Sequence, residues 1–458
     1  MTSIQVSLNP YNNTQNAVVE CQSHEEVKLV LQKSQKAKQT WGIMPLEKRL
    51  EYMAKFKDAI DNNQEELAKI IALEIGCPIV QTIQEVTKCV AILDYYIKNG
   101  AEYIADEIVI DNEKETKKIM YSPAGTLLHI APYNYPLYLA LRPIIPSLLV
   151  GNSNIIKTSS QTPLIGQAIN KLVKEAGLPE GVLEVIFVKG SDCEWIIEDD
   201  TINIVCLIGS ERAGSQVAQY SGKCLKKTLM ELGGADPMIV CSDADIAKVI
   251  DGVMASRLRN AGQSCNAAKR FLVHEDVVEE FEQQLITKLK QLVPGDPTDK
   301  KTTIGPVANL GGLETVQMQI MNSVKKGAKL IYGGEENSEY GCYMTPAVLR
   351  VTDTKCEVMS EEVFGPVLPI IAFKTIDEAI AIANDSSLGL GASVWTHNQT
   401  DISKCMNELD TGNVAVNGIV RGDPMLPFGG VKKSGYGREF GKVGVHELAN
   451  IKSVHITK

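Results

Sequence analysis

The run LLHIAPYNYPLYLALRPIIPSLLVGNSNIIK, residues 127–157, carries the pattern that decides the fold. It begins and ends with short apolar stretches, at 127–130 and 154–156, and each has the length of a buried strand. Between them, residues 136–150 have the apolar spacing of a helix. The same alternation continues along the chain, with strands expected at 183–188 and 204–208 and helices expected at 162–176 and 213–219. Strands that alternate with helices through short connections predict a parallel sheet covered on both faces.

The pattern changes on either side of this region. Ser23 and Glu26 form a capping box at the start of a helix, and a second helical stretch runs from Leu46 to Ile75, where Gly76 ends it. Residues 104–120 instead suggest a polar two-stranded ribbon, which we expect to pack on another subunit because a lone hairpin is marginal in water. After Glu231 the alternation resumes with a strand at 237–240, a helix capped by Ser242 and a strand at 270–273, which predicts a second α/β domain.

Composition excludes several classes of protein. Among 458 residues, 44% are hydrophobic and 22% are charged, as in ordinary globular proteins. The net charge of −10 disfavours a nucleic-acid-binding protein. The most apolar stretch, residues 127–151, holds four prolines and Arg142, so no membrane-spanning segment is expected. No signal peptide is apparent, and the eleven cysteines show no CxxC spacing, so we expect a cytoplasmic protein with reduced thiols and no bound metal.

Three polar residues occur where an apolar strand end is expected. Asn134 follows the strand at 127–130, Glu231 follows the pair Leu229-Met230, and Cys265 sits in a turn of small residues before the strand at 270–273. Each has an ordinary alternative. Asn134 suits a turn, Glu231 suits a cap or a solvated surface, and most of the eleven cysteines are expected to be small buried hydrophobes.

Seven segments, taken in order, closely resemble the aldehyde dehydrogenase superfamily, and the resemblance covers essentially the whole chain. They are APYNYP (131–136), KTSSQTP (157–163), GSERAG (209–214), ELGGAD (231–236), NAGQSCNAA (260–268), EEVFGPV (361–367) and PFGGVKKSGYGRE (427–439). Within the superfamily, the run GQSCNAAKRF (262–271) and the short length look most like bacterial succinate-semialdehyde dehydrogenases.

The resemblance implies an α/β fold with two parallel-sheet domains and a small β oligomerisation ribbon in a homodimer or homotetramer. The implied parts are a dinucleotide-binding domain at 1–102 and 122–230, a catalytic domain at 231–427, and oligomerisation strands at 103–121 and 440–458. It also implies that Cys265 is the nucleophile, that Glu231 is the general base for thioester hydrolysis, and that the Asn134 amide and the Cys265 backbone N–H stabilise the oxyanion.

The same resemblance implies a nicotinamide dinucleotide as cofactor. Its implied binding residues are Lys157, Ser160, Gly190, Gly209, Ser210, Glu362 and Phe364. Ser160 stands where many relatives that prefer NAD have a glutamate. A carboxylate would repel a 2′-phosphate, whereas a serine leaves room for it and Lys157 supplies positive charge. We therefore expect NADP to be favoured over NAD.

The implied substrate is succinic semialdehyde, whose distal carboxylate needs a cation. Arg142, eight residues after Asn134, and Arg259, six residues before Cys265, stand at the corresponding positions. Asp423 departs from the pattern, because it would oppose a carboxylate unless Arg421 pairs with it. Two alternatives remain at this stage. They are a dehydrogenase for another aldehyde, medium-chain or phosphorylated, and a non-catalytic binding protein of the same fold.

Overall fold

The apolar runs near residues 127, 154, 183 and 204 form the central sheet of the computed structural model, which describes residues 3–458. This sheet has the strand order β19-β9-β8-β5-β6-β7, in which all pairs are parallel except the edge pair β19–β9. The strands predicted near 127, 154, 183 and 204 are confirmed. The strands are β5 (Thr126–Ile130), β6 (Ser153–Lys157), β7 (Leu183–Ile186), β8 (Ile202–Ile208), β9 (Lys227–Glu231) and β19 (Gly435–Tyr436).

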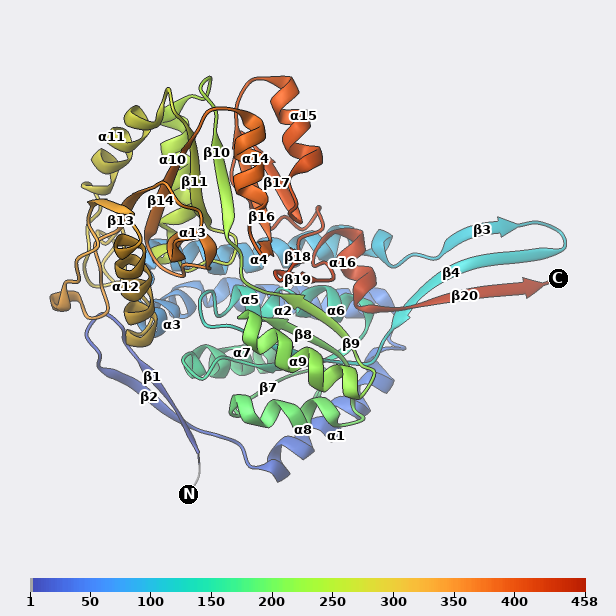
Figure 1. Ribbon diagram of the computed structural model, residues 1–458. Coiled ribbons are helices and arrows are strands. Elements are labelled where there is room, and N and C mark those ends of the chain that lie inside the picture. Colours follow the sequence, from blue (N-terminus) through green and yellow to red (C-terminus); the bar gives the residue numbers. More distant parts are fainter. Residues whose placement is uncertain (1–2) are drawn as a thin grey trace.

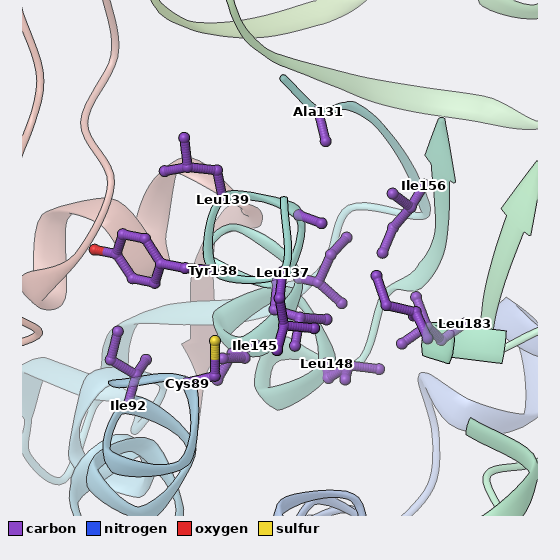
Figure 2. Close-up of a cluster of buried hydrophobic side chains, with 14 of the residues drawn as sticks. Cys89, Ile92, Ala131, Leu137, Tyr138, Leu139, Ile145, Leu148, Ile156 and Leu183 are labelled. Carbon is purple, nitrogen blue, oxygen red and sulfur yellow. The ribbon is translucent and has the colours of Figure 1, made fainter. Parts of the chain in front are cut away.

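Helices cover both faces of this sheet because its strands are apolar on both sides. On one face, Leu128 and Ile155 pack against α1, α8 and α9. On the other, Leu127 and Ile156 pack against α2 and α4–α7, and Figure 2 shows Leu137 and its neighbours meeting Cys89 of α4 there. The helices are α1 (His24–Trp41), α2 (Leu46–Asn62), α3 (Gln64–Ile75), α4 (Ile79–Tyr103), α5 (Tyr138–Leu141), α6 (Ile144–Val150), α7 (Pro163–Glu175), α8 (Cys193–Glu198) and α9 (Glu211–Lys223).

Local sequence explains where these helices begin and end. The capping box at Ser23 is present, with the Glu26 backbone N–H donating to Ser23 Oγ at 3.3 Å. The helix expected over 136–150 is two helices, because Pro143 has no N–H to continue the first one. The stretch 46–75 is likewise divided at Asn63 and ends at Gly76, whose φ is +72°. The N-terminal hairpin of β1 (Ile4–Leu8) and β2 (Gln15–Glu20) was not predicted.

A second sheet follows Glu231, with the order β12-β13-β14-β11-β10-β16-β17, parallel except at the β12–β13 edge. The predicted Ser242 cap is wrong. Asp245 caps α10, accepting from the Lys248 N–H at 3.3 Å. The strands are β10 (Asp236–Val240), β11 (Ala268–His274), β12 (Lys329–Tyr332), β13 (Ala347–Val351), β14 (Val367–Phe373), β16 (Gly391–Trp395) and β17 (Asn413–Val416), with β15 (Leu388–Gly389) and β18 (Val431–Lys432) paired beside them. The helices are α10 (Ile246–Arg257), α11 (Val278–Leu289), α12 (Leu310–Lys325), α13 (Glu357–Ser360), α14 (Ile376–Asn384) and α15 (Gln399–Glu408).

A three-stranded ribbon projects from the body of the molecule (Figure 1). It consists of β3 (Glu107–Asp111), β4 (Glu115–Pro123) and β20 (Ala449–Thr457), in the order β20-β4-β3. The segment 440–458, expected as strands, also contains helix α16 (Gly441–Glu447). The division into domains stays a prediction, with its boundary at the end of β9. No helix in residues 3–458 combines the length and the apolar character that crossing a membrane requires.

Candidate active site

The parallel strands of the first sheet end at one edge, and the predicted site residues gather there. Asn134 follows β5, Gly209 and Ser210 follow β8, and Glu231 is the last residue of β9. The carboxyl edge of an open parallel sheet is the usual place for a ligand. Seven of the predicted residues line one cavity of about 270 Å³ at this edge: Asn134, Gly209, Ser210, Glu231, Cys265, Glu362 and Phe364.

Cys265 reaches this edge from the second sheet, in the loop between the 3-10 helix η2 (Arg259–Gly262) and β11. Asn260 and Ala261 have left-handed backbone, with φ of 48° and 50°. Such residues are strained by about 1–3 kcal/mol each, and here the Asn260 side chain is held by a 2.6 Å hydrogen bond to the Asn134 carbonyl. Gly262 follows at φ 76°, where a Cβ would lie 2.4 Å from the Gly365 carbonyl oxygen. This turn places Cys265 beside Asn134.

The Asn134 side chain ties the two loops together. It is buried, and its Nδ2 donates to the Gln263 carbonyl at 3.0 Å. An amide nitrogen carries two hydrogens, so a second N–H is left for a ligand. Asn134 and Cys265 line the same cavity, as an oxyanion-stabilising pair requires.

Glu231 is buried beside Cys265 and is held by Arg142. Arg142 Nη2 lies 3.2 Å from Glu231 Oε2 and also contacts Glu439. Burial raises the pKa of Glu231 to about 7, against the opposing charge of Arg142. Glu231 Oε1 has no hydrogen-bond partner within residues 3–458. A general base works best when its pKa is near the working pH, and this carboxylate meets that condition.

The surroundings of Cys265 strongly shift the pKa of its thiol. Burial and then the Glu231 carboxylate raise the pKa of the thiol well above its usual value, while Arg142 and Lys269 act in the opposite direction. The thiol therefore needs a base to become a nucleophile. Glu231 is the adjacent group that can accept its proton.

The remainder of this cavity fits the nicotinamide half of a dinucleotide. Ser210 caps α9, with the Ala213 N–H donating to its Oγ at 3.3 Å, so a helix N-terminus faces the cavity. The Glu362 carboxylate can accept hydrogen bonds from ribose hydroxyls. It lies against Gly233, where a Cβ would be 2.3 Å from Glu362 Oε2. Phe364 meets Tyr133 edge to face at 6.2 Å and offers an aromatic wall.

The other predicted cofactor residues lie outside this cavity, along the same sheet edge. Lys157 is the last residue of β6, is buried, and has its pKa lowered by burial. Ser160 is exposed three residues later, and Gly190 begins the short 3-10 helix η1 (Gly190–Asp192) after β7. These positions can reach the adenosine half of a dinucleotide that extends along the edge.

A second cavity, of about 250 Å³, meets the first at Cys265 and Leu139. Arg142 and Arg259 both line it, as predicted, but they differ in their partners. Arg142 is engaged by two carboxylates, whereas Arg259 forms no ion pair in the part of the chain that the structure describes.

Two further cations line the second cavity and were missed as site residues. They are Lys88 of α4 and Arg421. Burial and then the charges of Arg142, Arg259 and Arg421 lower the pKa of Lys88 to about 8, so these four cations lie near one another. Asp423 does not line the cavity, and it does not pair with Arg421. Its Oδ1 accepts from the Met425 N–H at 2.9 Å. The expected opposition of Asp423 to a carboxylate stays a prediction.

The family model for the aldehyde dehydrogenase family matches residues 2–454. A probable succinate-semialdehyde dehydrogenase (NADP(+)) of Synechocystis sp. is 36% identical over 434 residues, covering 95% of each chain. The succinate semialdehyde dehydrogenase (NAD(P)+) Sad of Escherichia coli is 34% identical and covers 98% of this chain and 97% of its own. The solved structure of succinic semialdehyde dehydrogenase from Streptococcus pyogenes in complex with NADP+ has a TM-score of 0.96 at 31% identity and covers 100% of both chains.

The fold and the site together define an α/β enzyme in which a cysteine, an acid and an amide meet in one cavity at the carboxyl edge of a parallel sheet. The chain belongs to the aldehyde dehydrogenase family. The predicted fold class and enzyme class are confirmed by this match.

Proposed function

We propose that this enzyme oxidises succinic semialdehyde to succinate and uses NADP+ in preference to NAD+. The observation that carries the choice of substrate is the cationic second cavity beside Cys265. Lys88, Arg259 and Arg421 line it without a carboxylate partner anywhere in residues 3–458. Glu85 also lines it and interacts with the charges of Arg259 and Lys88, and its Oε1 accepts the N–H groups of Leu137 and Tyr138, both at 3.0 Å. The cations therefore outnumber the one carboxylate that faces them. An aldehyde with a distal carboxylate matches this charge.

The chemistry follows from the groups around Cys265. Glu231 takes the thiol proton, the thiolate adds to the aldehyde carbon, and the Asn134 amide stabilises the resulting oxyanion. The cofactor, when bound, supplies the hydride acceptor. Loss of a hydride from the adduct leaves an acyl thioester on Cys265. Glu231 passes the first proton to solvent, then accepts a proton from water as the water attacks the acyl carbon, and the thiolate leaves with release of the acid.

The proposed preference for NADP+ rests on the end of β6. Lys157 is a cation buried there, and Ser160 is exposed where a carboxylate would repel a 2′-phosphate. The names of the Synechocystis and Streptococcus pyogenes relatives carry NADP(+) or NADP+, in agreement with this preference. Ser160→Glu should lower kcat/KM for NADP+ at least tenfold and leave the value for NAD+ within about threefold. An equal effect on both cofactors would contradict the assignment.

The substrate test compares succinic semialdehyde with butanal, which has the same chain length and no charge. Arg259→Gln and Lys88→Gln should each lower kcat/KM for succinic semialdehyde about 10- to 100-fold, because a hydrogen bond between charged groups contributes about 1.5–3 kcal/mol. The value for butanal should change by less than about threefold. Lys98→Gln is the matched control, because Lys98 lies on the same helix and pairs with Asp94 at the surface. Equal losses for both aldehydes would refute a carboxylate site.

The number of cations also favours one other substrate class. Three cations without acid partners can neutralise a dianion, so a phosphorylated aldehyde belongs in the same assay. A kcat/KM that is higher for glyceraldehyde 3-phosphate than for succinic semialdehyde would make the phosphorylated class the substrate. The cytoplasmic location and the homodimer or homotetramer stay predictions.

A further inference from the structure

Lys269 is a buried lysine that touches both halves of the candidate site. It is the second residue of β11, and its side chain is 1% exposed. Its ammonium donates to the backbone carbonyls of Ser264 at 2.8 Å and Cys265 at 2.5 Å. The same ammonium lies 3.2 Å from Glu362 Oε1. A buried lysine is costly unless it is paired. The hydrogen-bond and ion-pair partners of this one belong to the nucleophile loop and the cofactor cavity, and its charge also acts on the buried Asp236.

Glu362 is fixed at one oxygen and accessible at the other. Oε1 receives Lys269 and also the Gly234 N–H at 3.2 Å. Oε2 lies over Gly233, in a carboxylate that lines the cavity and keeps about a quarter of its side-chain surface, 23%, exposed. A ribose hydroxyl can therefore donate to Glu362 without displacing Lys269.

Gly234 provides a second contact between Glu362 and the Cys265 peptide group. A Cβ at Gly234 would lie 2.5 Å from the Cys265 carbonyl oxygen, so the loop after β9 packs directly on the nucleophile's peptide group. The contacts run from Glu362 through Lys269 to the Cys265 carbonyl, and from Glu362 through Gly234 to the same carbonyl. A change in the charge or position of Glu362 thus reaches the backbone that carries the thiol.

We propose that Lys269 is a positioning residue through which occupation of the ribose site at Glu362 controls the placement of Cys265. This inference rests on the proposed use of a nicotinamide cofactor. When ribose hydroxyls share the charge of Glu362, Lys269 is held less strongly by Glu362 and more strongly by the two loop carbonyls. Coupling between sites is reciprocal, so the placement of Cys265 also affects the affinity for cofactor.

The reactivity of Cys265 toward iodoacetamide, read by peptide mass spectrometry, measures this coupling without turnover. Cys265 and Cys224 are the two cysteines in residues 3–458 that are partly exposed, so Cys224 serves as the internal reference in every sample. In the wild-type protein, saturating NADP+ should change the Cys265 labelling rate at least threefold. In Lys269→Gln, the Cys265 labelling rates with and without saturating NADP+ should differ by less than about 1.5-fold. The glutamine amide keeps one donor to the loop carbonyls.

Two further variants and two further measurements complete the test. Lys269→Arg, which retains the charge, should restore at least half of the wild-type ratio. Lys226→Gln is the matched control, because Lys226 donates to the carbonyls of Ile197 and Asp199 outside the candidate site and should leave the ratio unchanged. Thermal melting confirms that each variant is folded, and tryptophan fluorescence titration gives the Kd for NADP+.

The outcomes distinguish the role of Lys269, the coupling between the two sites and the proposed function. A folded Lys269→Gln protein with the wild-type ratio would overturn the role of Lys269. A wild-type protein that binds NADP+ with no change in Cys265 labelling would overturn the coupling and leave the proposed function intact. A wild-type protein that binds neither NADP+ nor NAD+ would refute the proposed function itself, and the coupling with it.

Discussion

Replacing Arg142 by methionine distinguishes two roles for this side chain. The sequence suggested that Arg142 binds the substrate carboxylate, whereas the structure pairs it with Glu231 at 3.2 Å and with Glu439. Methionine fills a similar volume without charge, so it leaves two buried carboxylates without their cation. We expect the free energy of unfolding to fall by about 3–5 kcal/mol, the usual result of removing one partner from a buried ion pair.

The loss should depend on pH with a definite sign. Burial already raises the pKa of Glu231 to about 7 and raises that of Glu439, and removal of Arg142 raises both further. A carboxyl whose pKa is higher in the folded protein loses stability as pH rises through that pKa. Urea unfolding should therefore show a larger difference between Arg142→Met and wild type at pH 8 than at pH 6.

Turnover should fall for all aldehydes alike. If about 2.7 kcal/mol of the attraction to Arg142 is lost, ionisation of Glu231 becomes about a hundredfold harder. From a wild-type pKa of about 7, this leaves the steady-state rate at pH 8 lower by about tenfold. Succinic semialdehyde and butanal should show the same loss. Arg142→Met/Glu439→Gln, which removes one of the two stranded carboxylates, should recover part of the stability.

The opposite pattern would refute this reasoning. It would consist of a KM for succinic semialdehyde raised more than tenfold, unchanged kinetics with butanal, and an unfolding free energy within about 0.5 kcal/mol of wild type. Arg142 would then be a substrate-binding residue, and its contacts with Glu231 and Glu439 would be incidental.

Three further predictions concern the base, a buried cap and the ribbon. Glu231→Gln should slow the burst of reduced cofactor, because the Cys265 thiol loses its base, and should also lower the steady state, because thioester hydrolysis loses the same base. The wild-type rate of thioester hydrolysis should rise between pH 6 and 8 because the pKa of Glu231 is about 7. Stopped-flow absorbance measures both, and a wild-type burst and steady state in the variant would contradict the assignment. Glu74→Gln should flatten the dependence of Tm on pH between about 4.5 and 7. Glu74 accepts the N–H groups at the start of α7, and burial raises its pKa to about 7. A curve of Tm against pH parallel to that of the wild type would contradict this. Ile451→Asp should dissociate the expected oligomer, because Ile451 is an apolar side chain left 55% exposed on β20, where another subunit is expected to cover it. Sedimentation of the wild type as a monomer would refute the role of the ribbon.

Much of the fold was predictable because its signals are local. The strands β5, β6, β7 and β8 are short apolar runs flanked by turns, and the capping box at Ser23 is a pattern of four residues. The division of residues 136–150 at Pro143 was also visible as a proline, but the apolar spacing runs on through it. The Ser242 cap failed because Asp245, three residues later, offers the same kind of oxygen nearer to the first helical residue. The antiparallel edge strand β19 is two residues long, and only its pairing with β9 makes it a strand.

The candidate site shows a sharper limit of sequence reasoning. Asn134, Glu231 and Cys265 stand beside predicted strands, the family resemblance assigned them roles, and they line one cavity. Lys88 was missed because it stands on a helix far from these motifs, and its approach to Arg259 depends on how α4 packs. The partners of Arg142 also depend on tertiary structure, since Glu231 and Glu439 lie far apart in the sequence.

The position of Cys265 between two cavities has a consequence for the order of events during turnover. Under the proposed function, an acyl group on the thiol would extend into the cavity of Lys88 and Arg259, while the cofactor would occupy the cavity of Glu362 and Phe364. On that proposal, reduced cofactor would be able to leave while the thioester persists, and its departure would open the cavity next to Glu231 to water. Cys265 thus stands between two cavities. On the proposed function, the aldehyde would enter through one of them and the reduced cofactor would leave through the other.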